Sequence, residues 1–297
     1  MRPHGTYSIV ARDPDTGELG AAVQSHWFSV GSLCTWARPG VGAVATQSVV
    51  EPGHGPHTLA RLQRGESAPD ALAAVIAGDP LAAVRQVGVV DAHGAVAVHT
   101  GADCIPEACH HVGAHWSCQA NMMDRATVPA AMSQAFEGAE GDLAERLMHA
   151  LDGAETEGGD VRGRQSAALL VVPAEGAAWQ FRVDLRVDDH ADPLAELRRL
   201  LGLQRAYELA GEADELMGEG RVDEAAPRYV RAAELAPGSD ELLFWAGLAL
   251  AQSGDVDAGV DAVRRAASVH PGWRTLLERL SPEFAPAAAA VRQALGR

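Results

Sequence analysis

The first two thirds of the chain alternate short apolar runs with turn-forming residues. The runs TYSIVAR (6–12) and ELGAAVQS (18–25) are rich in residues that favour strands. The intervening DPDTG supplies Asp, Pro and Gly for a turn, so the two runs predict a hairpin. A third strand is expected at VGAVATQSVV (41–50), after the breaker pair Pro39-Gly40.

Helical spacing of apolar residues comes next and predicts helices over 57–65 and 67–78. The second of these opens with Ser67 and has Asp70 three residues later, the pattern of a capping box. Further elements are expected as a hairpin at 84–101, a strand at 115–123, helices at about 127–137 and 141–156, and strands at 164–172 and 177–187. This order predicts an α+β fold in which two helical layers cover stacked sheets.

From about residue 204 the pattern changes to continuous amphipathic helix with an internal repeat. GRVDEAAPRYVRAAELAPG aligns without a gap with GDVDAGVDAVRRAASVHPG, so Gly220 and Gly254 are 34 residues apart. A helix–turn–helix period of this length that ends in Pro is typical of tetratricopeptide repeats. The predicted parts are a domain over 1–193, a connector helix over 194–203 and an all-α tetratricopeptide-like domain over 204–297.

Two repeats are fewer than the roughly three that a free-standing array needs. We therefore expect the helical domain to pack on the first domain or on a second subunit. This predicts a homo-oligomer, and it makes residues 204–297 a candidate surface for a protein partner.

Composition narrows the classes of function. The 24 Lys+Arg against 40 Asp+Glu give a formal charge of −16, which argues against nucleic acid and anionic membranes as partners. The sequence contains no lysine, so no lysine can act as a Schiff base, phosphate-binding cation or catalytic base. We find no leader and no long apolar run, which predicts a soluble cytoplasmic protein with its four cysteines reduced.

Thr6 opens the first predicted strand, and two interpretations compete for it. By itself, a threonine at this position is most often an ordinary strand residue. If the chain is trimmed before Thr6, however, the free α-amino group lies beside the hydroxyl and can act as its base. Such an amine has a pKa of about 8, so no lysine is required.

Several segments bear on this choice: TYSIVARDPDTGELGAAVQSHWFSVGS, WARPGVGAVATQS, QANMM and GGDVRGRQSAALLVV. Together they resemble the signature segments of an uncharacterised bacterial domain-of-unknown-function family in the N-terminal-nucleophile (Ntn) hydrolase superfamily. The resemblance runs from Thr6 to about Pro193. It implies a four-layer αββα sandwich with Thr6 as the candidate nucleophile of an amidohydrolase that cleaves a C–N amide bond, and no cofactor is expected.

The sequence departs from this family at its start. Many members begin Met-Thr, whereas Arg2-Pro3-His4-Gly5 stand before Thr6 here. Three explanations remain open: the start codon is misassigned, the chain cleaves itself between Gly5 and Thr6, or Thr6 is never freed and catalysis is lost.

Other polar residues are expected around Thr6. Asn121 is a candidate oxyanion donor, with a buried structural amide as the alternative, and Asp160 is a candidate for orienting the nucleophile. The loop GGDVRGRQS (158–166) holds arginines that would clamp a carboxylate of a small acidic substrate, with a solvated loop as the alternative. The predicted substrate-binding residues are Ser25, His26, Thr46, Gln47, Arg162, Arg164 and Ser166.

Two further segments contain side chains of the types that bind metal ions. The Cys- and His-rich DCIPEACHHVGAHWSC (103–118) fits no standard zinc spacing, so no metal site is predicted there. VDLRVDDH (183–190) has alternating charges on an edge or terminal strand, for which a solvated strand end is favoured over a cation site.

Two alternative functions remain. One is a catalytically inactive small-ligand-binding or scaffold protein whose helical repeats mediate protein–protein interaction. The other, weaker alternative is a metalloenzyme built on the His and Cys residues of 103–118.

Overall fold

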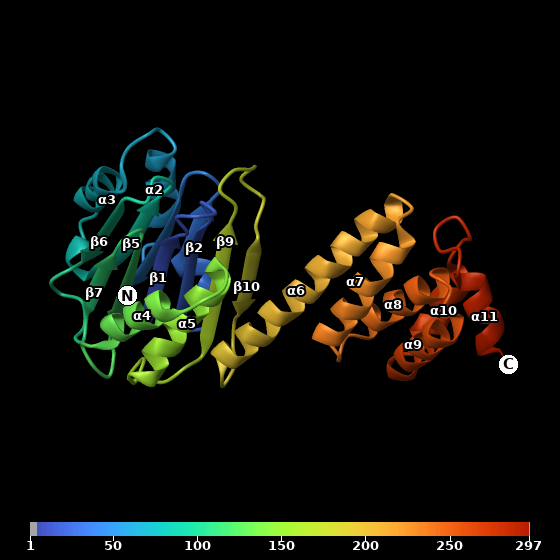
Figure 1. Ribbon diagram of the computed structural model, residues 1–297. Coiled ribbons are helices and arrows are strands. Elements are labelled where there is room, and N and C mark those ends of the chain that lie inside the picture. The colour runs from blue at the N-terminus through green and yellow to red at the C-terminus, as the bar shows by residue number, and fades with distance from the viewer. Residues whose placement is uncertain (1–4, 297) are drawn as a thin grey trace. The chain divides into compact units, whose positions relative to one another are not determined.

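The computed structural model describes residues 5–296 of the chain, shown in Figure 1. It divides into two compact units, one ending at Arg198 and the other beginning at Arg199. The expectations about Arg2, Pro3 and His4 fall outside the described residues.

Two antiparallel sheets form the centre of the first unit. The larger consists of β1 (Thr6–Arg12), β2 (Leu19–Ser25), β7 (Cys109–Gly113), β8 (Trp116–Asn121), β9 (Ser166–Val172) and β10 (Val183–Val187). Its strand order is β10-β9-β2-β1-β8-β7. The smaller sheet has the order β3-β4-β5-β6, from β3 (Thr35–Arg38), β4 (Gly42–Ser48), β5 (Arg85–Asp91) and β6 (Val96–Thr100).

The two sheets face each other, and helices cover their outer faces. Apolar side chains such as Val10, Val23, Ala45 and Val90 fill the space between the sheets. Helices α2 (His54–Leu62) and α3 (Ala68–Ala77) pack on the smaller sheet, and α4 (Val128–Gly138) and α5 (Leu143–Thr156) pack on the larger (Figure 1). The predicted α+β class is confirmed for this unit.

Local sequence accounts for most element boundaries. The Ser67 side chain accepts a hydrogen bond from the backbone N–H of Asp70, so the predicted cap starts α3. Helix α2 begins at His54, earlier than the predicted 57, and Gly55 in its first turn fits against the indole of Trp36. A Cβ on Gly55 would lie 2.2 Å from Trp36 Cδ1, so only glycine allows this approach.

The structure corrects other predicted boundaries. The last strand begins at Val183 instead of 177, because a turn in which the backbone N–H of Gln180 bonds to the Ala177 carbonyl precedes it. The short helix α1 (Gly31–Cys34) and the strands β3 and β7 were not predicted. Strands β3 and β7 are at most half-buried and have four or five residues, too short for a clear hydrophobic alternation.

The second unit is helical. Helix α6 (Pro193–Gly218) begins in the first unit and runs without a break through the predicted connector, 194–203. It is followed by α7 (Val222–Leu235), α8 (Asp240–Gln252), α9 (Val256–Val269), α10 (Gly272–Arg279) and α11 (Ala288–Leu295). Both bounds of α7 and α9 differ by 34 residues, as do the ends of α6 and α8.

Gly220 and Gly254 occupy matching turns of this repeat, each with a positive φ that favours glycine. Among residues 5–296, no helix is long and apolar enough to cross a membrane.

Candidate functional site

The start of β1 brings three strands together around Thr6. In the sheet register Thr6 lies opposite Ser25 of β2 on one side and opposite Asn121 of β8 on the other. Thr6 is fully buried, and its hydroxyl donates a hydrogen bond to Ser25 Oγ at 3.1 Å. Ser25 Oγ in turn donates to the carbonyl oxygen of Gly5. A chain of two hydroxyls therefore joins the Thr6 side chain to the carbonyl of the preceding peptide bond.

The Gly5 carbonyl has a second, charged donor. Arg162 Nη2 donates to Gly5 O at 2.9 Å. The same guanidinium binds the Asp160 carboxylate through two nitrogens, with Nη2 2.7 Å from Oδ2 and Nε 3.0 Å from Oδ1. The Asp160 side chain has no exposed surface, and backbone N–H groups of Arg162 and His26 also donate to it. Asp160 thus holds Arg162 rigidly against the Gly5–Thr6 peptide bond.

Position 5 requires glycine because the Arg162 and Asp160 side chains fill the space that a Cβ would occupy. A Cβ at position 5 would lie 2.7 Å from Arg162 Nη2 and 2.8 Å from Asp160 Oδ2, closer than van der Waals contact allows. The absence of a side chain lets the carbonyl approach the guanidinium directly.

Asn121 and Gln47 lie on the other side of Thr6 and bind its own carbonyl oxygen. Asn121 Nδ2 donates to Thr6 O at 3.4 Å, and Gln47 Nε2 donates to the same atom at 3.1 Å. Both amides also donate to Gln86 Oε1. These contacts position β1, and they direct the Asn121 amide to the carbonyl of Thr6.

The remaining predicted residues have other local partners. Thr46 Oγ1 donates to Glu51 O at 3.3 Å, and Ser166 Oγ donates to Trp27 O. His26 is exposed, and its ring nitrogen lies 3.3 Å from Arg164 O. Each of these three side chains contacts a backbone carbonyl in a neighbouring loop.

Arg164 points away from the Gly5–Thr6 bond, although it follows Arg162 by two residues. Its guanidinium lies 3.3 Å from Glu155 and 3.3 Å from Asp192. Glu155 also accepts a 2.5 Å hydrogen bond from the buried hydroxyl of Tyr7. Burial, and secondarily the negative charge of Glu155, raises the pKa of Tyr7 well above its usual value.

The Cys and His side chains of segment 103–118 contact separate parts of the fold. His110 bonds to Thr100 on β6, Cys109 Sγ to Ala126 O, and His115 to Gly94 O. Cys118 is buried in β8, where burial raises the pKa of its thiol. These partners draw the side chains to different parts of the first unit.

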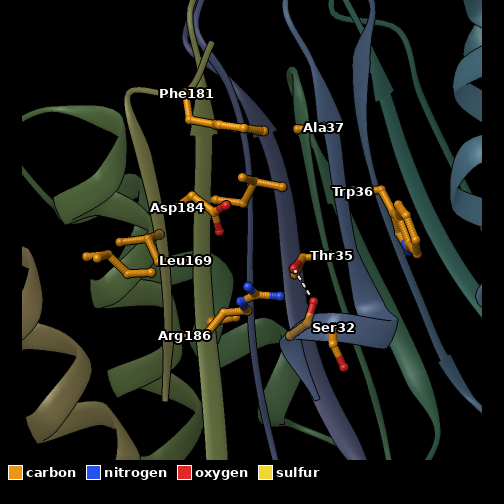
Figure 2. Close-up of a pocket in the computed structure, with 12 residues that line it drawn as sticks. Ser32, Thr35, Trp36, Ala37, Leu169, Phe181, Asp184 and Arg186 are labelled. Atoms are coloured by element: carbon orange, nitrogen blue, oxygen red, sulfur yellow. Dashed lines mark hydrogen bonds between the residues drawn. The ribbon is translucent and has the colours of Figure 1, made fainter. Parts of the chain in front are cut away.

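A cavity of about 220 Å³ lies apart from Thr6, at the edge of the two sheets formed by β3 and β10 (Figure 2). Ser32, Thr35, Phe181, Asp184 and Arg186 are among its lining residues. None of the predicted site residues lines it.

Sequence reasoning missed two features. One is the role of the Gly5 carbonyl as an acceptor, which no pattern of side chains reveals. The other is a buried cluster at the start of α2, where His54 Nε2 lies 3.0 Å from Asp79 Oδ2 and Arg85 Nε lies 2.6 Å from the same oxygen. A signal for this cluster was present, since Arg85 and Asp79 flank an otherwise apolar segment.

These observations define an α+β protein whose first unit has buried Thr6, Ser25 and Asp160 side chains and a partly exposed Arg162 clustered at the start of its first strand. Residues 6–197 match the family of unknown function DUF1028, and the chain belongs to this family. The crystal structure of protein SPO2555 from Silicibacter pomeroyi, described with the same family, is 30% identical with a TM-score of 0.61. That match covers 66% of this chain and 84% of the other. No curated protein matches the chain.

Proposed function

We propose that the first unit is an Ntn-type amidohydrolase, and that its nucleophile is Thr6, freed by cleavage of the Gly5–Thr6 bond. The observation that carries this proposal is the pair of donors, Ser25 and Arg162, on the Gly5 carbonyl oxygen. Two stacked antiparallel sheets with helices on both outer faces agree with the αββα sandwich of that superfamily.

The contacts support an N-to-O acyl shift as the cleavage step. The Thr6 oxygen attacks the Gly5 carbonyl carbon, and its proton passes through Ser25 to the carbonyl oxygen, following the two hydrogen bonds. Arg162 donates to the same oxygen and polarises the carbonyl for attack, so the tetrahedral intermediate carries this oxygen as a hydroxyl. The C–N bond then breaks, the Thr6 nitrogen takes up the proton, and water hydrolyses the resulting ester. The products are a Gly5 carboxylate and a chain that begins at Thr6.

After cleavage, the same groups serve an external substrate. The free Thr6 amine acts as the base for its own hydroxyl, which attacks the carbonyl carbon of a substrate amide. Arg162 then faces the position that the Gly5 carbonyl occupied, where it stabilises the substrate oxyanion or binds a substrate carboxylate. This favours a small substrate with a negative charge near the scissile amide.

Mass spectrometry of the purified full-length chain tests the proposal. We expect the wild-type protein to mature to a chain that starts at Thr6, and Thr6→Val to keep the Gly5–Thr6 bond, because valine has the same shape without a nucleophile. Thr6→Ser retains a hydroxyl and is expected to cleave. A folded wild-type protein whose Gly5–Thr6 bond stays intact on prolonged incubation would overturn the proposal.

A second candidate function concerns the helical unit, where we propose a peptide-binding role for a tetratricopeptide-like array. A groove of about 820 Å³ there is lined by the aromatic residues Tyr207, Trp245 and Phe284. Its charged lining residues, Asp214, Glu241 and Glu283, are all acidic. This combination favours a segment that carries both basic and apolar side chains.

A further inference from the structure

The outer edge of β10 is an unpaired strand edge to which the proposed function assigns no role. β10 lies at the end of the six-stranded order and pairs with β9 on one side only. The backbone groups on its other edge therefore face outward from the sheet, in an arrangement that can accept a further strand.

The side chains of β10 alternate in a simple way. Val183 and Val187 are buried on one face, whereas Asp184 and Arg186 are exposed on the other. Figure 2 shows Asp184 and Arg186 projecting from β10 on the side of the cavity. Within residues 5–296 neither side chain forms an ion pair or a hydrogen bond, so their charges are available to a partner.

The order of these charges is self-complementary. In an antiparallel pairing of β10 with a second copy of itself, a two-fold axis at Leu185 places Asp184 opposite Arg186 of the second copy, and Arg186 opposite Asp184. Shifting the axis to residue 184 would oppose two aspartates, and shifting it to 186 would oppose two arginines. Within 183–187, only the register centred on Leu185 pairs opposite charges.

We infer that two copies of this chain associate through their β10 edges, in antiparallel register about Leu185, to give one sheet continuous across the dimer. Charged side chains on an edge strand usually discourage pairing. Here opposite charges alternate, so they select one register and one partner instead. The inference does not depend on the role of Thr6.

Two neighbouring features favour this interface. The methylene stem of Arg186 packs against Gly31, where a Cβ would lie 3.1 Å from Arg186 Cγ, so the arginine is partly ordered before pairing. Just before β10, Trp179 is 76% exposed and Phe181 is 46% exposed. The two-fold axis would repeat both aromatic residues at each end of the paired strands and add apolar contact area.

Sedimentation equilibrium of the full-length protein tests the inference through charge reversal. We expect the wild type to form a dimer of twice the chain mass of 31.1 kDa. Asp184→Arg or Arg186→Asp should each weaken association about tenfold or more, because like charges then meet across the axis. The double variant D184R/R186D restores opposite charges and should restore the dimer.

Cysteine cross-linking gives a test that does not rely on charge. In the expected register the two copies of residue 185 are directly opposed, with Cα atoms about 4.5–5.5 Å apart, which a disulfide can bridge. Leu185→Cys should therefore form a covalent dimer on mild oxidation. Asp184→Cys should not, because its two copies are offset along the strands, and the wild type controls for the natural cysteines.

A monomeric wild type at about 100 μM, well above the micromolar range of weak specific association, would overturn the inference. So would a dimer that forms equally well in the wild type and both single charge-reversal variants, or cross-linking at 184 as efficient as at 185. Circular dichroism of each variant establishes that the fold is retained.

Discussion

At the scale of single residues, two arginines of one loop differ sharply in what they contact. Arg162 binds both the buried Asp160 carboxylate and the Gly5 carbonyl. Arg164 instead lies against Glu155 and Asp192. Their sequence contexts are similar, so the difference arises from the turn at Gly163, whose φ of 100° reverses the direction of the loop.

This difference predicts that substitutions of Arg162 slow cleavage of the Gly5–Thr6 bond. Arg162→Gln removes the charged donor from the Gly5 carbonyl, and the loss of one such donor typically slows the chemical step about 10²–10³-fold. The cleavage rate of Arg162→Lys should lie between those of the wild type and Arg162→Gln, because an ammonium group cannot contact both Asp160 oxygens and the Gly5 carbonyl at once. The rate of appearance of chains starting at Thr6, followed by mass spectrometry after cell-free synthesis, measures the effect.

Arg164→Gln is the matched control. It is the same substitution two residues away, and it should leave the cleavage rate within about twofold of the wild type, because the Arg164 guanidinium pairs with Glu155 and Asp192 and not with the Gly5 carbonyl. If both glutamine variants slow cleavage equally, the effect comes from a general change in the loop's structure, and the specific role of Arg162 is contradicted.

At the scale of elements, the start of α2 is tied to β5 by the His54–Asp79–Arg85 cluster. His54 is 4% exposed, and its Nδ1 has no hydrogen-bond partner within 5–296. Because the Asp79 carboxylate only accepts, the histidine proton resides on Nε2, which faces it. Arg85 also donates to Val49 O at 2.5 Å and so anchors the segment that precedes α2.

The cluster predicts a loss of stability in weak acid. Burial lowers the pKa of His54 despite the nearby Asp79 carboxylate. The unfolded chain therefore takes up this proton at a higher pH than the folded one. The free energy of unfolding should fall as the pH drops below about 6.5, by at most about 1.4 kcal/mol per pH unit for one proton.

Asp79 reinforces this trend at lower pH. Burial by itself would raise the pKa of Asp79, but hydrogen bonds from Arg85 and the backbone of Leu81 leave it lower than usual. Its contribution is present above pH about 4 and is lost as the pH falls further. Urea denaturation between pH 7 and 5 should show a smaller decline for His54→Gln than for the wild type. The same slope in both proteins would show that His54 takes up no extra proton on unfolding, and would contradict the prediction.

At the scale of the whole molecule, the chain carries two units with separate apolar cores. The helical unit has its own clusters, one around Ala213 and Tyr229 and another around Phe244 and Val263. This agrees with the 34-residue repeat, in which each helical pair packs against the next. A binding role for this unit can therefore be tested without altering the Thr6 site.

The acidic groove of the helical unit predicts binding of basic, apolar peptides. Glu241→Lys and Glu283→Lys reverse charges that line it, and each should weaken binding of an Arg- and Leu-rich peptide about tenfold. Glu219→Lys reverses an exposed charge that does not line the groove and should have little effect. Fluorescence anisotropy of a labelled peptide measures the affinities, and equal affinities in all four proteins would reject the groove as the binding site.

Local patterns allowed much of the architecture to be predicted. Alternation and turn residues located β1 and β2, the capping serine located α3, and the 34-residue period located α7 and α9. These features depend on interactions between residues that are close in sequence, which is why they can be recognised without a fold. The resemblance carried by the segments around Thr6 is confirmed at the level of the family.

Which groups surround Thr6 could be determined only from the tertiary structure. Arg162 and Gly5 are 157 residues apart, and their contact depends on the pairing of β1 with β8 and on the turn at Gly163. Thr46 and Ser166 illustrate the converse, since each lies on a strand near Thr6 yet bonds to a nearby loop. Local sequence specified the strand that Thr6 opens, because strand formation depends on neighbouring residues. The packing of distant segments decided which groups surround the Gly5–Thr6 bond, because side-chain direction depends on the whole fold.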